Sequence, residues 1–213
     1  MNLNDYRVGE RLRPQWKQVL ERWCAIVEQW CEVAGPDRPW WHLEMSNAGL
    51  LSAAAMQCGC ASLIESSVLK SNRQWGRSDL WVQFPKGGHS VWSSEESQSF
   101  CEFKFSHVDS GSIDLKMLNQ ACRDAVVVDW PAGEKIGVCL FICRSNDPMD
   151  EAKIKASIDQ IWNDGQLDAA AWAFPECIRD IPGDNKVFSP GIVMAMKLVG
   201  SQSSKDYASH KPL

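Results

Sequence analysis

The sequence predicts an α/β protein in which helices and strands alternate around a central sheet. Three observations support this prediction. Residues 78–84 and 99–106 alternate apolar and polar side chains, as half-buried strands do. Residues 135–143 form a continuous apolar run, which is typical of a buried central strand. Residues 13–34 and 113–128 repeat apolar side chains at helical spacing.

Shorter patterns predict the remaining elements. Gly35 and Pro36 end the first helix. The Ala-rich stretch 48–57 predicts a second helix, for which Ser46 or Asn47 supplies the cap. The other expected segments are a strand at 61–69, turns at 72–76 and 85–88, an exposed loop at 93–98, a helix at 147–163, strands at 172–174 and 192–199, and a long loop at 175–190.

The length of 213 residues suits one domain, which we expect to span residues 1–200 and to be followed by a polar, flexible tail at 201–213. An apolar content of 45% is ordinary for a globular chain. No apolar run is long enough to span a membrane, and the N-terminus lacks the pattern of a signal peptide. We therefore expect a cytoplasmic protein without a membrane partner.

The net charge of −5 argues against a broad basic surface for nucleic acid, although a local basic stripe can coexist with it. The residues that fit such a stripe are Lys70, Arg73, Arg77 and Lys86. The nine cysteines include no C-x₂-C pair and do not cluster with the four histidines. This spacing argues against structural zinc and favours buried, reduced thiols.

Tryptophan recurs every seven residues along the first helix, at Trp16, Trp23 and Trp30. This spacing places the three rings on one helix face. Such a face could stack bases or bind a partner. The simpler interpretation is a stripe that packs in the core or at a homodimer interface.

Two acids and a lysine form the candidate site, and all three lie in expected strands. Asp79 lies in one strand, and Glu102 and Lys104 lie in the next. Residues two apart point to the same face of a strand, so Glu102 and Lys104 share a face, with Cα atoms roughly 6.6–7 Å apart. If the strands are neighbours, a divalent ion such as Mg²⁺ could bridge the two carboxylates. Lys104 could then orient or deprotonate a water, or hold a phosphate.

An acid-x-lysine triplet alone is weak evidence, because the chain has four. The others are Asp114/Lys116, Glu151/Lys153 and Asp184/Lys186, which fall in expected helices or a loop. Only Glu102/Lys104 lies in an apolar alternating strand, after an Asp-bearing strand and before a helix. The alternative interpretation is a surface ion pair worth less than ~1 kcal/mol.

The order of Asp79, then Glu102-x-Lys104, then a helix and an apolar strand resembles the PD-(D/E)xK nuclease superfamily, which has the restriction-endonuclease-like fold. The resemblance covers residues 44–145, so 146–200 would be a C-terminal extension. It implies a mixed sheet flanked by helices, Asp79 and Glu102 as metal ligands, and Lys104 as the catalytic lysine. Mg²⁺ would be the cofactor, and Mn²⁺ could substitute.

One position departs from the family pattern, since Ser78 stands where a proline usually precedes the Asp. Many members also carry a Glu on the first helix of the core. The candidates for this auxiliary acid are Glu44, before the expected helix, and Glu65, after it. Gln120, on the polar side of the helix 113–128, is a further auxiliary candidate.

The resemblance implies hydrolysis of phosphodiester bonds in nucleic acid, in DNA rather than RNA, leaving a 5′-phosphate. The size suggests a stand-alone defence, mobile-element or toxin nuclease. The alternative is a non-catalytic interaction or assembly module on the same fold. The acidic total charge and the Trp-rich helix favour that alternative.

Overall fold

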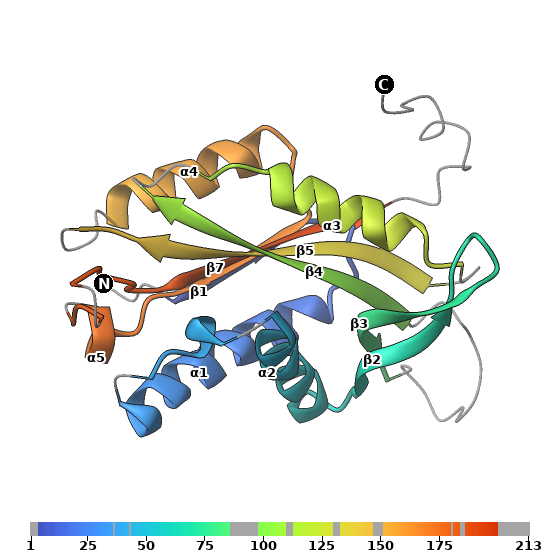
Figure 1. The fold of residues 1–213 in the computed structure, drawn as a ribbon, viewed down its shortest axis with the longest axis horizontal. Coiled ribbons are helices and arrows are strands. Elements are labelled where there is room, and N and C mark those ends of the chain that lie inside the picture. The colour runs from blue at the N-terminus through green and yellow to red at the C-terminus, as the bar shows by residue number, and fades with distance from the viewer. Residues whose placement is uncertain are drawn as a thin grey trace.

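The computed structural model shows a seven-stranded sheet with helices on both faces (Figure 1). Helices α1 and α2 cover one face, and α3 and α4 cover the other. The prediction of an α/β protein with a flanked mixed sheet is therefore confirmed. The residues that the structure describes are 4–35, 37–42, 44–85, 98–109, 113–129, 133–146, 151–179, 181–183 and 186–199.

Strands and helices alternate along most of the chain. The strands are β1 (Asp5–Val8), β2 (Ala61–Leu69), β3 (Trp75–Gln83), β4 (Gln98–Asp109), β5 (Gly133–Arg144), β6 (Ala169–Ala173) and β7 (Ile192–Val199). The helices are α1 (Trp16–Ala34), the 3₁₀ turn η1 (Pro39–Trp41), α2 (Glu44–Gln57), α3 (Lys116–Val126), α4 (Glu151–Asn163) and α5 (Glu176–Arg179).

The strand order in the sheet is β1-β6-β7-β5-β4-β3-β2. Strands β2, β3 and β4 form an antiparallel meander, and β4 then pairs in parallel with β5. A parallel pair needs a crossover connection, and α3 lies within the connection between these two strands. The C-terminal strands complete the same sheet, because β7 pairs with β5 on the side away from β4.

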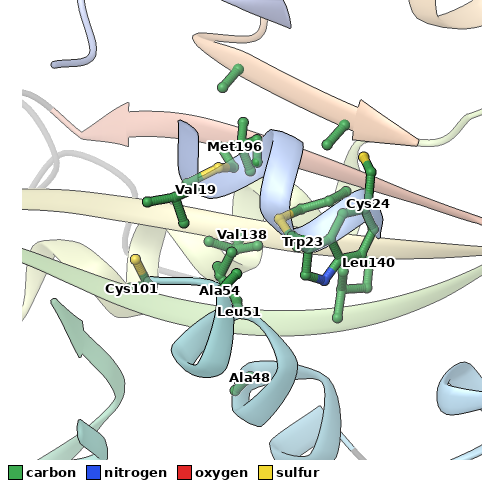
Figure 2. Close-up of a cluster of buried hydrophobic side chains, with 14 of the residues drawn as sticks. Val19, Trp23, Cys24, Ala48, Leu51, Ala54, Cys101, Val138, Leu140 and Met196 are labelled. Atoms are coloured by element: carbon green, nitrogen blue, oxygen red, sulfur yellow. The ribbon is translucent and has the colours of Figure 1, made fainter. Parts of the chain in front are cut away.

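The tryptophan stripe of α1 is mainly a core feature. Trp16 and Trp23 are completely buried, whereas Trp30 is 36% exposed and lies edge-on to His42. Figure 2 shows Trp23 among apolar side chains from α2, β4, β5 and β7. The packing interpretation is therefore confirmed for the first two rings.

The structure differs from the sequence prediction at the start of α2, at the bounds of β3 and β6, and in two short elements. Strand β3 begins at Trp75, inside the turn predicted at 72–76, and β6 covers residues 169–173 where a strand at 172–174 was predicted. Helix α2 begins at Glu44, not at residue 48, and Asn47 is not its cap but is buried and donates a hydrogen bond to the Pro39 carbonyl. An acid in the first turn suits the positive end of the helix dipole. Strand β1 was not expected, and α5 lies inside the segment predicted as a long loop. The predicted tail 201–213, Lys86 and most of the loop at 93–98 lie outside the described residues.

Candidate active site

The candidate site lies where β3 and β4 separate. The two strands pair only between Leu80–Gln83 and Gln98–Cys101. Beyond this paired stretch, β3 stays paired with β2 and β4 stays paired with β5. Carboxylates accept hydrogen bonds from the edge of β4 beyond this point. Asp79 Oδ2 accepts from the Phe103 backbone N–H at 2.7 Å, and Glu44 accepts from the Phe105 backbone. The separation of the strands therefore brings acids from β3 and α2 to β4.

Glu102 is a buried carboxylate that forms an ion pair with Lys70. Glu102 is only 6% exposed, and its Oε1 atom lies 2.8 Å from Lys70 Nζ. Burial raises the pKa of Glu102 to about 7, and the negative charge of Asp79 adds to the rise. The hydrogen bond and charge of Lys70 oppose this rise without cancelling it. The surroundings of Glu102 therefore favour a protonated carboxyl group or a carboxylate with a cation bound to it.

Lys70 reaches Glu102 from the turn between β2 and β3. Its side chain lies over Gly76, where a Cβ would stand 2.9 Å from Lys70 Cε. The glycine thus leaves the space that the lysine chain occupies. The sequence suggested Lys70 only as part of a basic stripe, because its contact with Glu102 depends on the fold of the hairpin.

Lys104 is held by two oxygen atoms. Its Nζ lies 3.0 Å from Asp124 Oδ2 and donates to the Phe103 carbonyl at 2.8 Å. Burial lowers the pKa of Lys104, but the hydrogen bond and charge of Asp124, with the charges of Glu44 and Asp79, outweigh burial and raise it. The amine is therefore a charged ammonium near neutral pH.

Helix α3 positions the partner of Lys104 through a short chain of hydrogen bonds. Gln120 Nε2 donates to Asp124 Oδ1 at 2.8 Å, and Arg123 donates to Gln120 Oε1 at 2.7 Å. Gln120 thus reaches the site through Asp124. Sequence reasoning did not identify Asp124, and the sign that could have found it is its place one turn after Gln120 on the polar side of the helix.

The two candidate auxiliary acids have different positions. Glu44 is the first residue of α2. Burial and the charge of Asp79 raise its pKa, and the charge of Lys104 opposes the rise without cancelling it. Glu65 lies on β2 with a backbone φ of 52°, and its exposed side chain forms an ion pair with Arg77 at 2.9 Å. The structure therefore brings Glu44 to the site and turns Glu65 toward solvent.

The donor set fits a hard divalent cation in its chemistry. Among the described residues, no group of three or more His, Cys, Asp or Glu side chains converges on one metal position. Mg²⁺, however, uses one or two carboxylates and keeps several waters, so the pair Asp79 and Glu102 is sufficient. The pKa of Glu102 is raised first by burial and then by the charge of Asp79, and Lys70 offsets only part of this rise. A cation at this pair would have to draw Glu102 from Lys70.

Comparisons of the chain with protein-family models, with curated proteins and with solved structures found no match. Within the part of the chain that the structure describes, no helix combines the length and apolar character needed to cross a membrane. What the site does must therefore be argued from its own geometry and charge.

Proposed function

We propose that this protein is a metal-dependent nuclease of the PD-(D/E)xK type. The observation that carries the proposal is that Asp79 lies close enough for its charge to raise the pKa of Glu102, of Lys104 and of Glu44, near the point where β3 and β4 separate. The order α2-β2-β3-β4-α3-β5, with an antiparallel meander followed by a parallel strand, supports it. This is the arrangement expected of a restriction-endonuclease-like core over residues 44–145.

Asp79 and Glu102 are the residues that would hold Mg²⁺ or Mn²⁺. The ion would neutralise charge on the phosphoryl oxygens and lower the pKa of a bound water. Asp79 is fixed for this role by its hydrogen bond to the β4 backbone. Glu102 is only 6% exposed, so little water competes for its carboxylate.

Lys104 would hold the scissile phosphate rather than remove a proton. Its neighbours raise its pKa, so the free base is scarce near neutral pH. An ammonium at this place can donate to a phosphoryl oxygen, where fixed positive charge stabilises the negative charge that develops in the transition state. Asp124 acts as a positioning residue, because it holds the ammonium group of Lys104 in place.

The second candidate function is a non-catalytic interaction module on this fold. A specific observation favours it, since both site lysines already pair with acids, Lys70 with Glu102 and Lys104 with Asp124. Ion pairs of this kind can exist simply because each buried charge needs a partner, without any catalytic role. The acidic total charge points the same way.

A cleavage assay separates the two functions. Plasmid DNA and single-stranded RNA are incubated with the protein and Mg²⁺ or Mn²⁺, with and without EDTA. The nuclease proposal expects metal-dependent cleavage that falls at least about 100-fold in Lys104→Ala and Glu102→Gln. Lys116→Ala is the matched control, because Lys116 also belongs to an acid-x-lysine triplet but is exposed at the start of α3. Equal rates in all four proteins would refute the proposal.

A further inference from the structure

The end of the β2–β3 hairpin, residues 67–77 and here called the turn, carries an exposed tryptophan at the first position of β3. Trp75 is 76% exposed, compared with 46% for Trp41 and 36% for Trp30. A single exposed apolar side chain is common on protein surfaces, so the significance of Trp75 depends on the residues around it. Trp75 pairs with Leu69 at the outer end of the hairpin and does not belong to the buried core.

The same turn is basic although the chain as a whole is acidic. Between Ser66 and Ser78 the charged residues are Lys70, Arg73 and Arg77, and no acid is present. Arg73 and Arg77 are exposed, and Arg77 pairs with an exposed carboxylate of β2. Exposed pairs of this kind are worth less than ~1 kcal/mol, so a phosphate could replace the carboxylate.

The turn is joined firmly to the candidate site. The Ser71 N–H donates to the Val127 carbonyl and the Asp129 N–H donates to the Leu69 carbonyl, each at 2.7 Å. These bonds tie the hairpin to the end of α3, and Figure 1 shows the hairpin at the same side of the molecule as that helix end. Lys70, in the same turn, contacts Glu102 directly. A ligand held by the turn would therefore lie beside the site.

We propose that this turn binds single-stranded nucleic acid, with one unpaired base stacked on Trp75 and backbone phosphates paired with Arg73 and Arg77. The inference rests on the proposed nuclease function and adds its substrate class. An aromatic ring between two arginines matches a strand in which bases and phosphates alternate. Single strands or unpaired ends are required, because duplex bases already stack on one another and expose no face to the indole.

The test measures binding without cleavage, by fluorescence anisotropy of labelled single-stranded and duplex DNA oligonucleotides in EDTA. Wild type should prefer the single strand. Trp75→Ala should weaken single-strand binding by about 5- to 140-fold, which corresponds to one lost stacking contact. Trp75→Phe, which keeps a ring, should retain most of the affinity. Trp30→Ala is the matched control, because Trp30 is partly exposed and belongs to α1, which Figure 1 shows away from the β2–β3 hairpin.

The arginines give an independent measurement. Arg73→Ala and Arg77→Ala should each make the dependence of log affinity on log salt concentration less steep by about 0.7, the value for one lost phosphate contact on a single strand. Unchanged affinity in Trp75→Ala would overturn the inference, as would a preference for duplex. A Trp75-dependent dimer in sedimentation, with no change in oligonucleotide binding, would also overturn it and assign the turn to a protein interface.

These outcomes are separate from those of the cleavage assay. Cleavage that depends on Lys104 together with binding that ignores Trp75 would leave the nuclease function standing and remove only the turn as its binding surface. Binding that depends on Trp75 without cleavage would keep the binding surface and remove the nuclease.

Discussion

Replacing Glu102 with glutamine should make the protein more stable at alkaline pH and leave it nearly unchanged at acid pH. The wild-type carboxylate is buried, and burial raises its pKa from 4.5 to about 7. The ionised form is therefore less stable in the folded protein than in the unfolded chain. Glutamine has nearly the same shape and carries no charge, so it imitates the protonated acid.

The size and the sign follow from proton linkage. Below about pH 4.5 the acid is protonated in both states and adds no penalty. Between about pH 4.5 and 7 the unfolded chain loses the proton first, so the wild-type free energy of unfolding falls as pH rises. Above about pH 7 the full penalty is present, and it amounts to about 3 kcal/mol.

The assay is urea unfolding of both proteins at about pH 4.5 and about pH 8 in EDTA. The stability of Glu102→Gln relative to wild type should increase by about 3 kcal/mol between these conditions. Glu65→Gln is the control, because Glu65 is an exposed acid in a surface ion pair, and its substitution should change stability by less than about 1 kcal/mol. A relative stability of Glu102→Gln that does not depend on pH, or that falls as pH rises, would refute this account of Glu102.

Three further predictions concern the partners of the site and the packing beneath it. Asp124→Asn should slow single-turnover cleavage by about 10- to 100-fold with little change in substrate binding, because Lys104 loses its charged partner. Lys70→Met should tighten Mn²⁺ binding by about tenfold in calorimetry, because the ammonium no longer competes for Glu102. Gly137→Ala should lower the free energy of unfolding by about 1–3 kcal/mol, since a Cβ there would lie 2.6 Å from a backbone nitrogen of α3.

Local pattern was sufficient to predict most of the sheet. The strand expected at 61–69 matches β2, and the one expected at 192–199 matches β7. Both segments lie between turns or loops, and the second is strongly apolar. The local strand preference of these residues therefore agrees with their pairing in the sheet. The run 135–143 lies within β5, where residues from Ile136 to Cys143 are buried.

Long-range contacts account for what the sequence did not reveal. Strand β1 has only four residues. It is extended because it pairs with β6, where Asp5 lies opposite Trp172. Asp124 becomes a site residue only because α3 packs against β4 and β5 and so faces Lys104. The β1–β6 pairing leaves no pattern within one segment, and the place of Asp124 on the polar side of its helix does not by itself show that it faces Lys104.

The most direct test of the central claim is a crystal soaked in Mn²⁺ and measured for anomalous scattering. The account predicts one peak within about 2–2.5 Å of a carboxylate oxygen of Asp79 and of Glu102, with Lys70 displaced from Glu102. A protein that shows no peak there, with the bond between Lys70 and Glu102 intact at saturating Mn²⁺, would contradict it.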